Sequence, residues 1–155
     1  MKRCFDTVFN GVDYVCRLLL VILTGTVLIT VFGRYVLSAT PRWSEELALA
    51  LLVWLSLLSV ALGLRGGWHL RLDLVVKNLP ARPQAVTEGL NSLIAILTAG
   101  LFVWFGTRIA VLNLGSLMPG LGISAFWQYL AVPVSGVLML AALAERAIYG
   151  RTAAE

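Results

Sequence analysis

The sequence is short of charge. Only 13% of its 155 residues are Asp, Glu, Lys or Arg, whereas 59% are hydrophobic, and the mean hydropathy is +0.89. A water-soluble domain carries about 25% charged residues, so these charges cannot cover an ordinary globular surface. Disorder is excluded because a disordered chain needs low hydrophobicity. The length fits one domain, and the composition predicts an all-α integral membrane protein.

Side chains that carry chemistry are also scarce. His69 is the only histidine, which excludes a haem held by two histidines of one chain and makes a Ser-His-Asp triad implausible. Cys4 and Cys16 match no metal or redox spacing. The net charge of +4 comes from basic residues scattered between apolar blocks, which is typical of membrane orientation signals and not of nucleic-acid binding. We expect no enzyme activity and no cofactor.

Runs without charge locate the membrane spans, because a charged side chain near the bilayer centre is costly. The last such run, 109–144, is far longer than the roughly 20 residues that cross a bilayer. Its Gly- and Pro-rich segment 113–122 marks a loop, and Pro133 is expected to kink the helix after it. The sequence therefore predicts one membrane domain, 1–155, with four transmembrane helices at about 16–37, 45–64, 86–112 and 124–144.

A cleaved signal peptide is the alternative interpretation of the first span. The leading segment contains Asp6 and Asp13, and no clean small-x-small site follows the apolar run, which favours a retained helix. Of the twelve Lys and Arg residues, nine fall on one side of a four-span protein. The excess of basic residues predicts that both termini are cytoplasmic.

The connection between the second and third spans carries an apolar stripe. Leu72, Val75, Val76 and Leu79 recur at helical spacing, opposite Asp73 and Lys77. The alternation over 68–76 would also fit a strand, but a lone strand at a membrane leaves backbone groups unbonded. We expect a short amphipathic interfacial helix at about 70–79 on the cytoplasmic surface, with Arg65, Arg71 and Lys77 contacting lipid headgroups.

Two polar segments are candidate functional sites. The first is Arg42-Trp43-Ser44-Glu45-Glu46. In a structural interpretation, Ser44 caps a helix, and the two glutamates are stabilised by the positive N-terminal end of that helix. Trp43 would then lie at the membrane interface. A functional interpretation makes the segment a docking point for a partner. In the second segment, His69 and Asp73 are four residues apart and are expected to pair on one helix face.

Small residues predict two packing faces. One face of the second helix carries Ala48, Leu52, Ser56, Ser59 and Gly63, and one face of the third carries Ser92, Ala95, Ala99 and Gly106. In lipid such faces allow close helix packing. Bulky side chains are expected to point outward, toward lipid or a larger membrane partner: Trp54, Phe102, Trp104 and Phe105.

Taken in order, the motifs resemble a known family. They are Phe32-Gly-Arg-Tyr-Val36, Trp43-Ser-Glu-Glu46, Ala61-Leu-Gly63, His69-Leu-Arg-Leu-Asp73 and Leu79-Pro80. Over roughly residues 15–148 the chain resembles the small membrane subunit of a tripartite ATP-independent periplasmic (TRAP) transporter, the DctQ family. Trp43 and Glu46 match the family's Trp-x-x-Glu element, and His69 and Asp73 match its His-x-x-x-Asp element.

The resemblance implies a function that composition could not. It implies a non-catalytic subunit of the bacterial inner membrane that braces a large membrane subunit and helps dock a periplasmic solute-binding protein. The large subunit of such transporters carries the substrate and sodium sites for uptake of an organic acid. Partners would then be the large subunit, the binding protein and phospholipid.

Two other classes stay open at this stage. A small autonomous exporter would be expected to carry an acid within a span, and no span centre here holds one. A four-helix membrane enzyme of the glutathione and eicosanoid type would need a basic cofactor cluster. Arg65, Arg71, Lys77 and Arg82 could supply it.

Overall fold

The computed structural model describes residues 2–66 and 81–149. Its elements in chain order are α1 (Lys2–Tyr35), α2 (Arg42–Arg65), α4 (Ala81–Leu112), α5 (Phe126–Tyr129) and α6 (Ala131–Tyr149). Four stretches are long and apolar enough to cross a membrane: Phe5–Tyr35, Arg42–Arg65, Leu90–Leu112 and Phe126–Ala147. The prediction of an all-α membrane protein with four spans is confirmed. The expected interfacial helix at about 70–79 lies outside the described residues.

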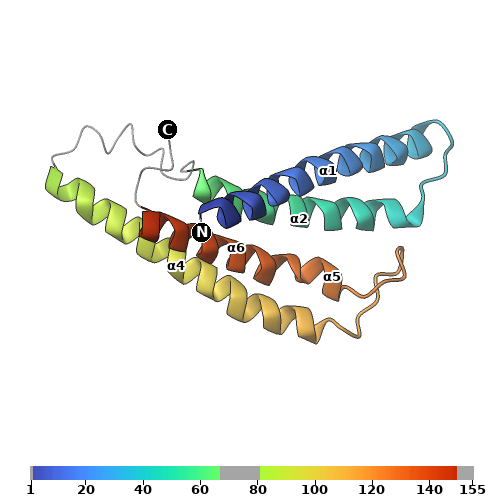
Figure 1. Cartoon of the computed structure of the whole chain (residues 1–155). Helices are drawn as coiled ribbons and strands as arrows, with labels where there is room; N and C mark the ends of the chain where they lie inside the picture. The colour runs from blue at the N-terminus through green and yellow to red at the C-terminus, as the bar shows by residue number, and fades with distance from the viewer. Residues whose placement is uncertain (1, 67–80, 150–155) are drawn as a thin grey trace.

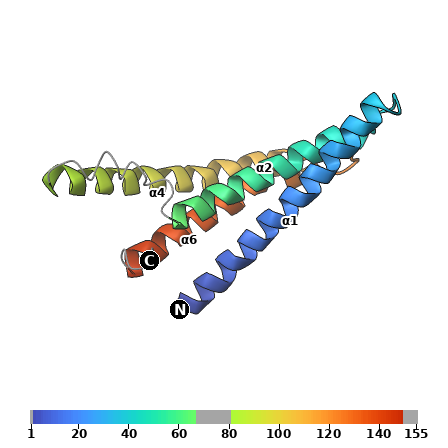
Figure 2. The ribbon, with the colours of Figure 1, turned by 90° about the horizontal axis from the view of Figure 1, so that it is seen from above.

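The long helices form a row whose order differs from the chain order. α1 packs against α2, α2 against α6, and α6 against α4 (Figure 1). The C-terminal helix therefore lies between α2 and α4, and α1 and α4 form the two edges of the row. Seen from above, the N-terminus of α1 and the beginning of α4 diverge from each other (Figure 2). Each edge helix thus presents most of its surface to whatever surrounds the chain.

The helices extend beyond the charge-free runs. α1 begins at Lys2 and α4 at Ala81, well before the expected starts near residues 16 and 86. The charge-free criterion finds residues that suit the bilayer core, whereas a helix propagates at little cost through charged residues once it has nucleated. The polar first half of α1 still buries apolar side chains, since Phe9 is 1% exposed and Cys16 is 7% exposed.

The fourth span is interrupted earlier than expected. It consists of α5 and α6, which are separated at Leu130, so the disturbance expected from Pro133 lies about one turn before the proline. Pro133 instead lies in the first turn of α6, where a missing backbone N–H is tolerated. The interruption falls just before the proline because proline has no N–H to donate to the carbonyl of Tyr129, four residues back.

A small core joins the three helices α2, α4 and α6. Its buried members are Ala61, Leu64, Ala99 and Met139. The small residues allow close approach, because a Cβ at Gly106 would lie 2.8 Å from the side chain of Pro133. Three of the four small residues expected on one face of the third helix, Ala95, Ala99 and Gly106, do pack inward, while Ser92 is exposed.

The small face predicted for the second helix packs inside the chain only in part, since Ala48 and Gly63 are half-buried. On α2, Leu52, Ser56 and Ser59 are exposed. The buried residues of this helix are Ser44, Leu51, Leu58, Ala61 and Leu64. The Ser59 side chain is hydrogen-bonded to that of Cys16 in α1, so the small stripe contributes to the contact between α1 and α2. Leucine and alanine side chains fill much of the rest of the contact with α1 and α6.

Candidate functional site

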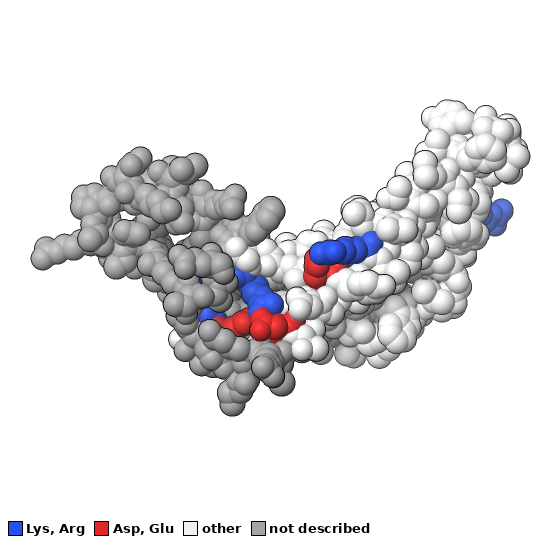
Figure 3. Space-filling view, turned by 45° about the horizontal axis from the view of Figure 1, so that its top comes forward, with Lys and Arg blue, Asp and Glu red and all other residues white. Residues whose placement is uncertain are grey.

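The polar groups of the described chain gather at its two ends. We call the end with connections 36–41 and 113–125 the loop end, and the end with Asp6, Arg65 and Glu145 the ion-pair end. The space-filling view shows basic and acidic atoms side by side on part of the surface, and basic atoms without acidic neighbours at the right-hand edge (Figure 3). Unlike-charged partners reduce the cost of placing charge near lipid.

Glu46 holds the connection between α4 and α5. Its Oε2 accepts hydrogen bonds from the backbone N–H groups of Gly120, at 2.9 Å, and Leu121, at 3.0 Å. A carboxylate that accepts two backbone donors makes strong, charge-assisted bonds. These bonds tie the N-terminal part of α2 to a loop 74 residues further along the chain, so the glutamate of the Trp-x-x-Glu element has a structural role within the chain.

Two glycines shape the loop that Glu46 holds. A Cβ on Gly120 would lie 2.4 Å from the carbonyl oxygen of Arg42, so only glycine lets the loop approach the start of α2. Gly122 has φ +67°, a conformation that glycine adopts without steric cost. The turn is closed by hydrogen bonds between Met118 and its neighbours Ile123 and Gly122, at 2.9 and 2.8 Å.

Ser44 does not cap α2, contrary to the prediction. The helix begins at Arg42, with Pro41 preceding it and no side-chain capping bond. The Ser44 side chain is 0% exposed, and its hydroxyl donates to the carbonyl of Pro41 at 2.8 Å. Proline fixes φ near the helical value, which lets the helix start earlier than a serine cap would set it.

Glu45 pairs with a residue that the sequence analysis did not single out. Its carboxylate forms an ion pair with Arg34 at the end of α1. Both side chains are more than half exposed, at 61% and 54%, so the pair adds little stability. Opposite charges on either side of a short connection were the available signal for this contact.

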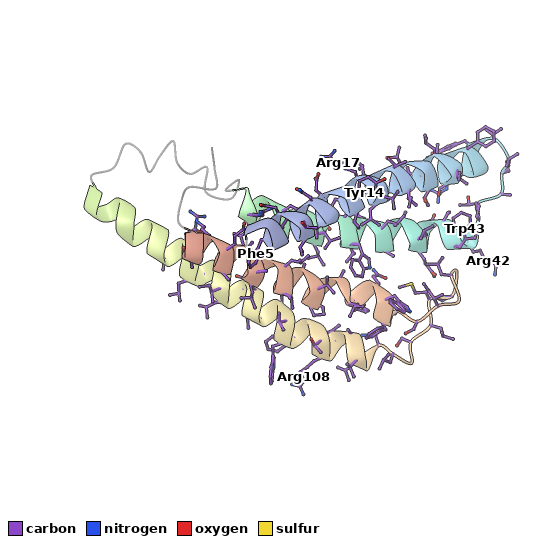
Figure 4. All side chains as sticks on the ribbon, in the orientation of Figure 1. Phe5, Tyr14, Arg17, Arg42, Trp43 and Arg108 are labelled. Atoms are coloured by element: carbon purple, nitrogen blue, oxygen red, sulfur yellow. The ribbon has the colours of Figure 1, made fainter. Side chains whose placement is uncertain are left out.

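Arg42 and Trp43 complete the segment at the loop end. Both are exposed, Trp43 by 39%, and both lie at the right-hand end of α2 in the stick view (Figure 4). The structure thus divides the segment into two parts. Ser44 and Glu46 form hydrogen bonds in the interior of the chain. Arg42, Trp43 and Glu45 are exposed, and Glu45 pairs with Arg34 on the surface.

At the ion-pair end, Arg65 joins three helices. Its Nε and Nη2 donate to Glu145 of α6 at 2.8 and 2.9 Å, and Nη2 also pairs with Asp6 of α1. The guanidinium carbon lies 4.6 Å from the centre of the Phe9 ring, which is a cation–π distance. Sequence reasoning assigned Arg65 to lipid contact and missed both carboxylates, because these partners lie far away in the chain.

Several predicted site residues lie outside the described residues. They are His69, Arg71, Asp73 and Lys77, and their roles stay predictions. Within 2–66 and 81–149, no group of three His, Cys, Asp or Glu side chains could hold a metal.

Two of the four bulky residues expected to face outward point inward instead. The Trp54 indole N–H donates to the carbonyl of Trp127 at 3.0 Å, and Phe102 packs on the core. Trp104 and Phe105 are exposed, by 67% and 52%. The interruption at Leu130 explains the first contact, because a helix end leaves carbonyl groups without helical partners.

Comparisons with known proteins agree with the resemblance. The family model described as "Tripartite ATP-independent periplasmic transporters, DctQ component" matches residues 23–152. A putative TRAP transporter small permease protein of Haemophilus influenzae is 24% identical over 148 residues, which are 96% of this chain and 92% of that protein. The C4-dicarboxylate TRAP transporter small permease protein DctQ of Rhodobacter capsulatus is 29% identical over 101 residues, 63% of this chain and 44% of that protein.

A longer relative is also similar. The sialic acid TRAP transporter permease protein SiaT of Haemophilus influenzae is 30% identical over 129 residues, which cover 76% of this chain but only 20% of that protein. The chain therefore spans about a fifth of SiaT and nearly the whole of the putative small permease protein.

Proposed function

Because the chain belongs to the DctQ family of TRAP transporters, we propose that it is the small permease subunit that braces a large membrane subunit and helps to dock a periplasmic solute-binding protein. Members of the family are transporter components without catalytic activity. The transporter that this chain would serve takes up an organic acid with sodium.

The observation that carries the bracing role is the single row of helices. α1 and α4 each pack along one neighbour, and only 11% and 17% of their most apolar windows are buried. A chain that transported by itself would need polar groups that converge between its helices near the bilayer centre. The ion pairs of the described residues lie near the ends of α2 and α6 or, for Asp13 and Arg17, just before the charge-free run of α1. This placement suits a scaffold better than a transport path.

The docking role is proposed for the outward-facing residues at the loop end. Arg42, Trp43 and Glu45 are exposed, and exposed charged and aromatic side chains set the specificity of protein interfaces. Glu46 supports them indirectly, since its bonds to Gly120 and Leu121 hold the adjacent loop.

The orientation follows from the basic residues. With nine of twelve Lys and Arg residues on the side of the termini, we propose that both ends are cytoplasmic in the bacterial inner membrane. The loop end then faces the periplasm, where a solute-binding protein would meet it.

Co-purification and reconstitution test the proposal. The chain is expected to co-purify with a large TRAP subunit, and vesicles that contain both subunits and a solute-binding protein should show sodium-driven organic-acid uptake. Vesicles with the chain alone should show none. Uptake by the chain alone, or failure to associate with any large subunit encoded beside it, would contradict the bracing role.

A docking variant separates interface from fold. Trp43→Ala with Glu45→Gln removes exposed groups only, so the complex should form in normal yield while binding-protein affinity and uptake fall. Leu49→Ala is the matched control, because Leu49 is exposed on the same helix but lies further from the loop end. Unchanged uptake in the double variant would contradict the docking role of Trp43 and Glu45.

A further inference from the structure

A cavity at the ion-pair end takes no part in the proposed function. Its volume is about 520 Å³, and its wall combines residues of α1, the end of α2 and α6: Asp6, Phe9, Asn10, Asp13, Leu62, Arg65, Gly66 and Glu145. Three carboxylates, one amide and one guanidinium therefore face one space that also has apolar walls.

Some of the polar atoms in this wall remain available. Among the described residues, the hydrogen bonds of Arg65 use Nε and Nη2, which leaves both N–H groups of Nη1. The Arg65 side chain is 24% exposed and lines the cavity. Asp13 forms an ion pair with Arg17 through Oδ2, which lies 2.6 Å from Nη2 of the arginine. The Asp13 side chain is 46% exposed. The cavity thus offers a donor for an anion and acceptors for a cation.

The position of the cavity matches the depth of lipid headgroups. α2 has 24 residues, so it is about 36 Å long, slightly more than the roughly 30 Å of a hydrocarbon core. Arg65 is its last residue. Since Arg65, Asp6 and Glu145 are bonded to one another, the whole cluster lies at the boundary between lipid tails and headgroups.

We propose that this cavity binds the headgroup of an aminophospholipid, in which a phosphate and a primary ammonium lie close together. The phosphate would accept from Nη1 of Arg65 and from the amide of Asn10. The ammonium would donate to the oxygen of Asp13 that does not pair with Arg17. The lipid tails would leave along the apolar wall toward Leu62.

The charges of the wall select this headgroup over others. An anionic headgroup such as phosphoglycerol has no cation for the carboxylates, which outnumber the one guanidinium. A choline headgroup carries a cation whose methyl groups cannot donate hydrogen bonds to a carboxylate, whereas an ammonium has three N–H donors. A free phosphoethanolamine would have the same charges but would lack the tails.

Native mass spectrometry of the delipidated full chain in detergent tests the proposal. Phosphatidylethanolamine, phosphatidylcholine and phosphatidylglycerol with identical acyl chains are titrated separately, and phosphoethanolamine without tails is the fourth ligand. We expect phosphatidylethanolamine to bind at least about fivefold more tightly than either other lipid. Equal binding of the three lipids would overturn the proposal, and free phosphoethanolamine binding as tightly as the lipid would refute a lipid ligand.

Asp13→Asn identifies the cavity as the site. This substitution keeps the size of a partly exposed side chain and leaves the contacts between Arg65 and Glu145 in place, so the fold should persist. It should reduce the preference for phosphatidylethanolamine over phosphatidylcholine to about twofold or less. Glu45→Gln, which removes the same charge at the loop end, should leave the preference unchanged. If Asp13→Asn keeps the full preference, or Glu45→Gln loses it equally, the cavity is not the site.

Discussion

Arg65 and Glu145 form a two-point ion pair between the last residue of α2 and the last part of α6, with both donor–acceptor distances below 3 Å. The Glu145 side chain is only 7% exposed, while that of Arg65 is 24% exposed. A parallel pair of bonds of this kind fixes the orientation of both groups. Two helices that meet only in the tertiary structure are therefore joined at a defined register.

Removal of one partner of this pair should destabilise the chain more than removal of both. Arg65→Gln leaves the carboxylate of Glu145 buried without a cation, and losses of this kind cost about 3–5 kcal/mol. We expect a value near the lower limit because Arg65 is partly exposed. The combined substitution Arg65→Met with Glu145→Leu should cost less than Arg65→Gln alone.

Thermal unfolding of the purified variants in one detergent measures this difference. A double variant that is less stable than Arg65→Gln would contradict this expectation. It would show that the attraction between the two charges exceeds the free energy needed to remove them from water.

Gly120→Ala tests the close approach of the loop to α2. The added Cβ would lie 2.4 Å from the carbonyl oxygen of Arg42, so the loop must move and weaken its bonds to Glu46. Overpacking of this kind costs about 1–3 kcal/mol. Gly115→Ala is the matched control, because a Cβ there meets nothing within 4 Å. Equal melting temperatures for the two variants would mean that the loop adapts freely.

Glu46 and Glu45 should differ in their effect on stability although they are neighbours. Glu46→Ala removes the acceptor of two backbone N–H groups, and we expect a loss of about 2 kcal/mol. Glu45→Ala breaks an exposed ion pair, so its effect should stay within about 0–1 kcal/mol. Chemical denaturation of both variants, with limited proteolysis of the loop 113–125, measures the difference. A larger loss for Glu45→Ala would reverse the assignment of these roles.

Gly106→Ala should separate α4 from α6. Its Cβ would lie 2.8 Å from the side chains of Val132 and Pro133, where the first turn of α6 cannot yield easily. We expect a cost of about 1–3 kcal/mol. Gly100→Ala on the same helix, where a Cβ meets nothing within 4 Å, should stabilise α4 slightly because alanine favours helix. Thermal melting curves of the two variants measure the effects. A change in melting temperature of the same sign for both variants would contradict this prediction.

A reporter fusion tests the orientation. A periplasm-active reporter joined after Gly150 should be inactive, because nine of the twelve basic residues favour a cytoplasmic C-terminus. The same reporter in the loop after Gly115 should be active. Activity after Gly150 would contradict the proposed topology.

The composition alone determined the class of this protein. Hydropathy and the positions of charges are local properties of the chain, and a bilayer excludes charge from its centre whatever the tertiary packing. That is why four spans could be predicted from charge-free runs. The family was indicated by the Trp-x-x-Glu and His-x-x-x-Asp elements together, which are likewise read from the linear sequence. The face of α4 with Ala95, Ala99 and Gly106 was also predictable, since small residues at helical spacing allow close contact.

Only the tertiary structure decided which groups meet. Glu46 bonds a loop 74 residues away, and Arg65 meets a carboxylate 80 residues away, and no local pattern selects such partners. Spacing alone also does not tell which members of the small stripe on α2 are covered, because Ser56 and Ser59 look alike whether they face a helix or the surroundings. The order of the row, with α6 between α2 and α4, depends on the complementary shapes of the packed side chains, which a linear pattern does not contain.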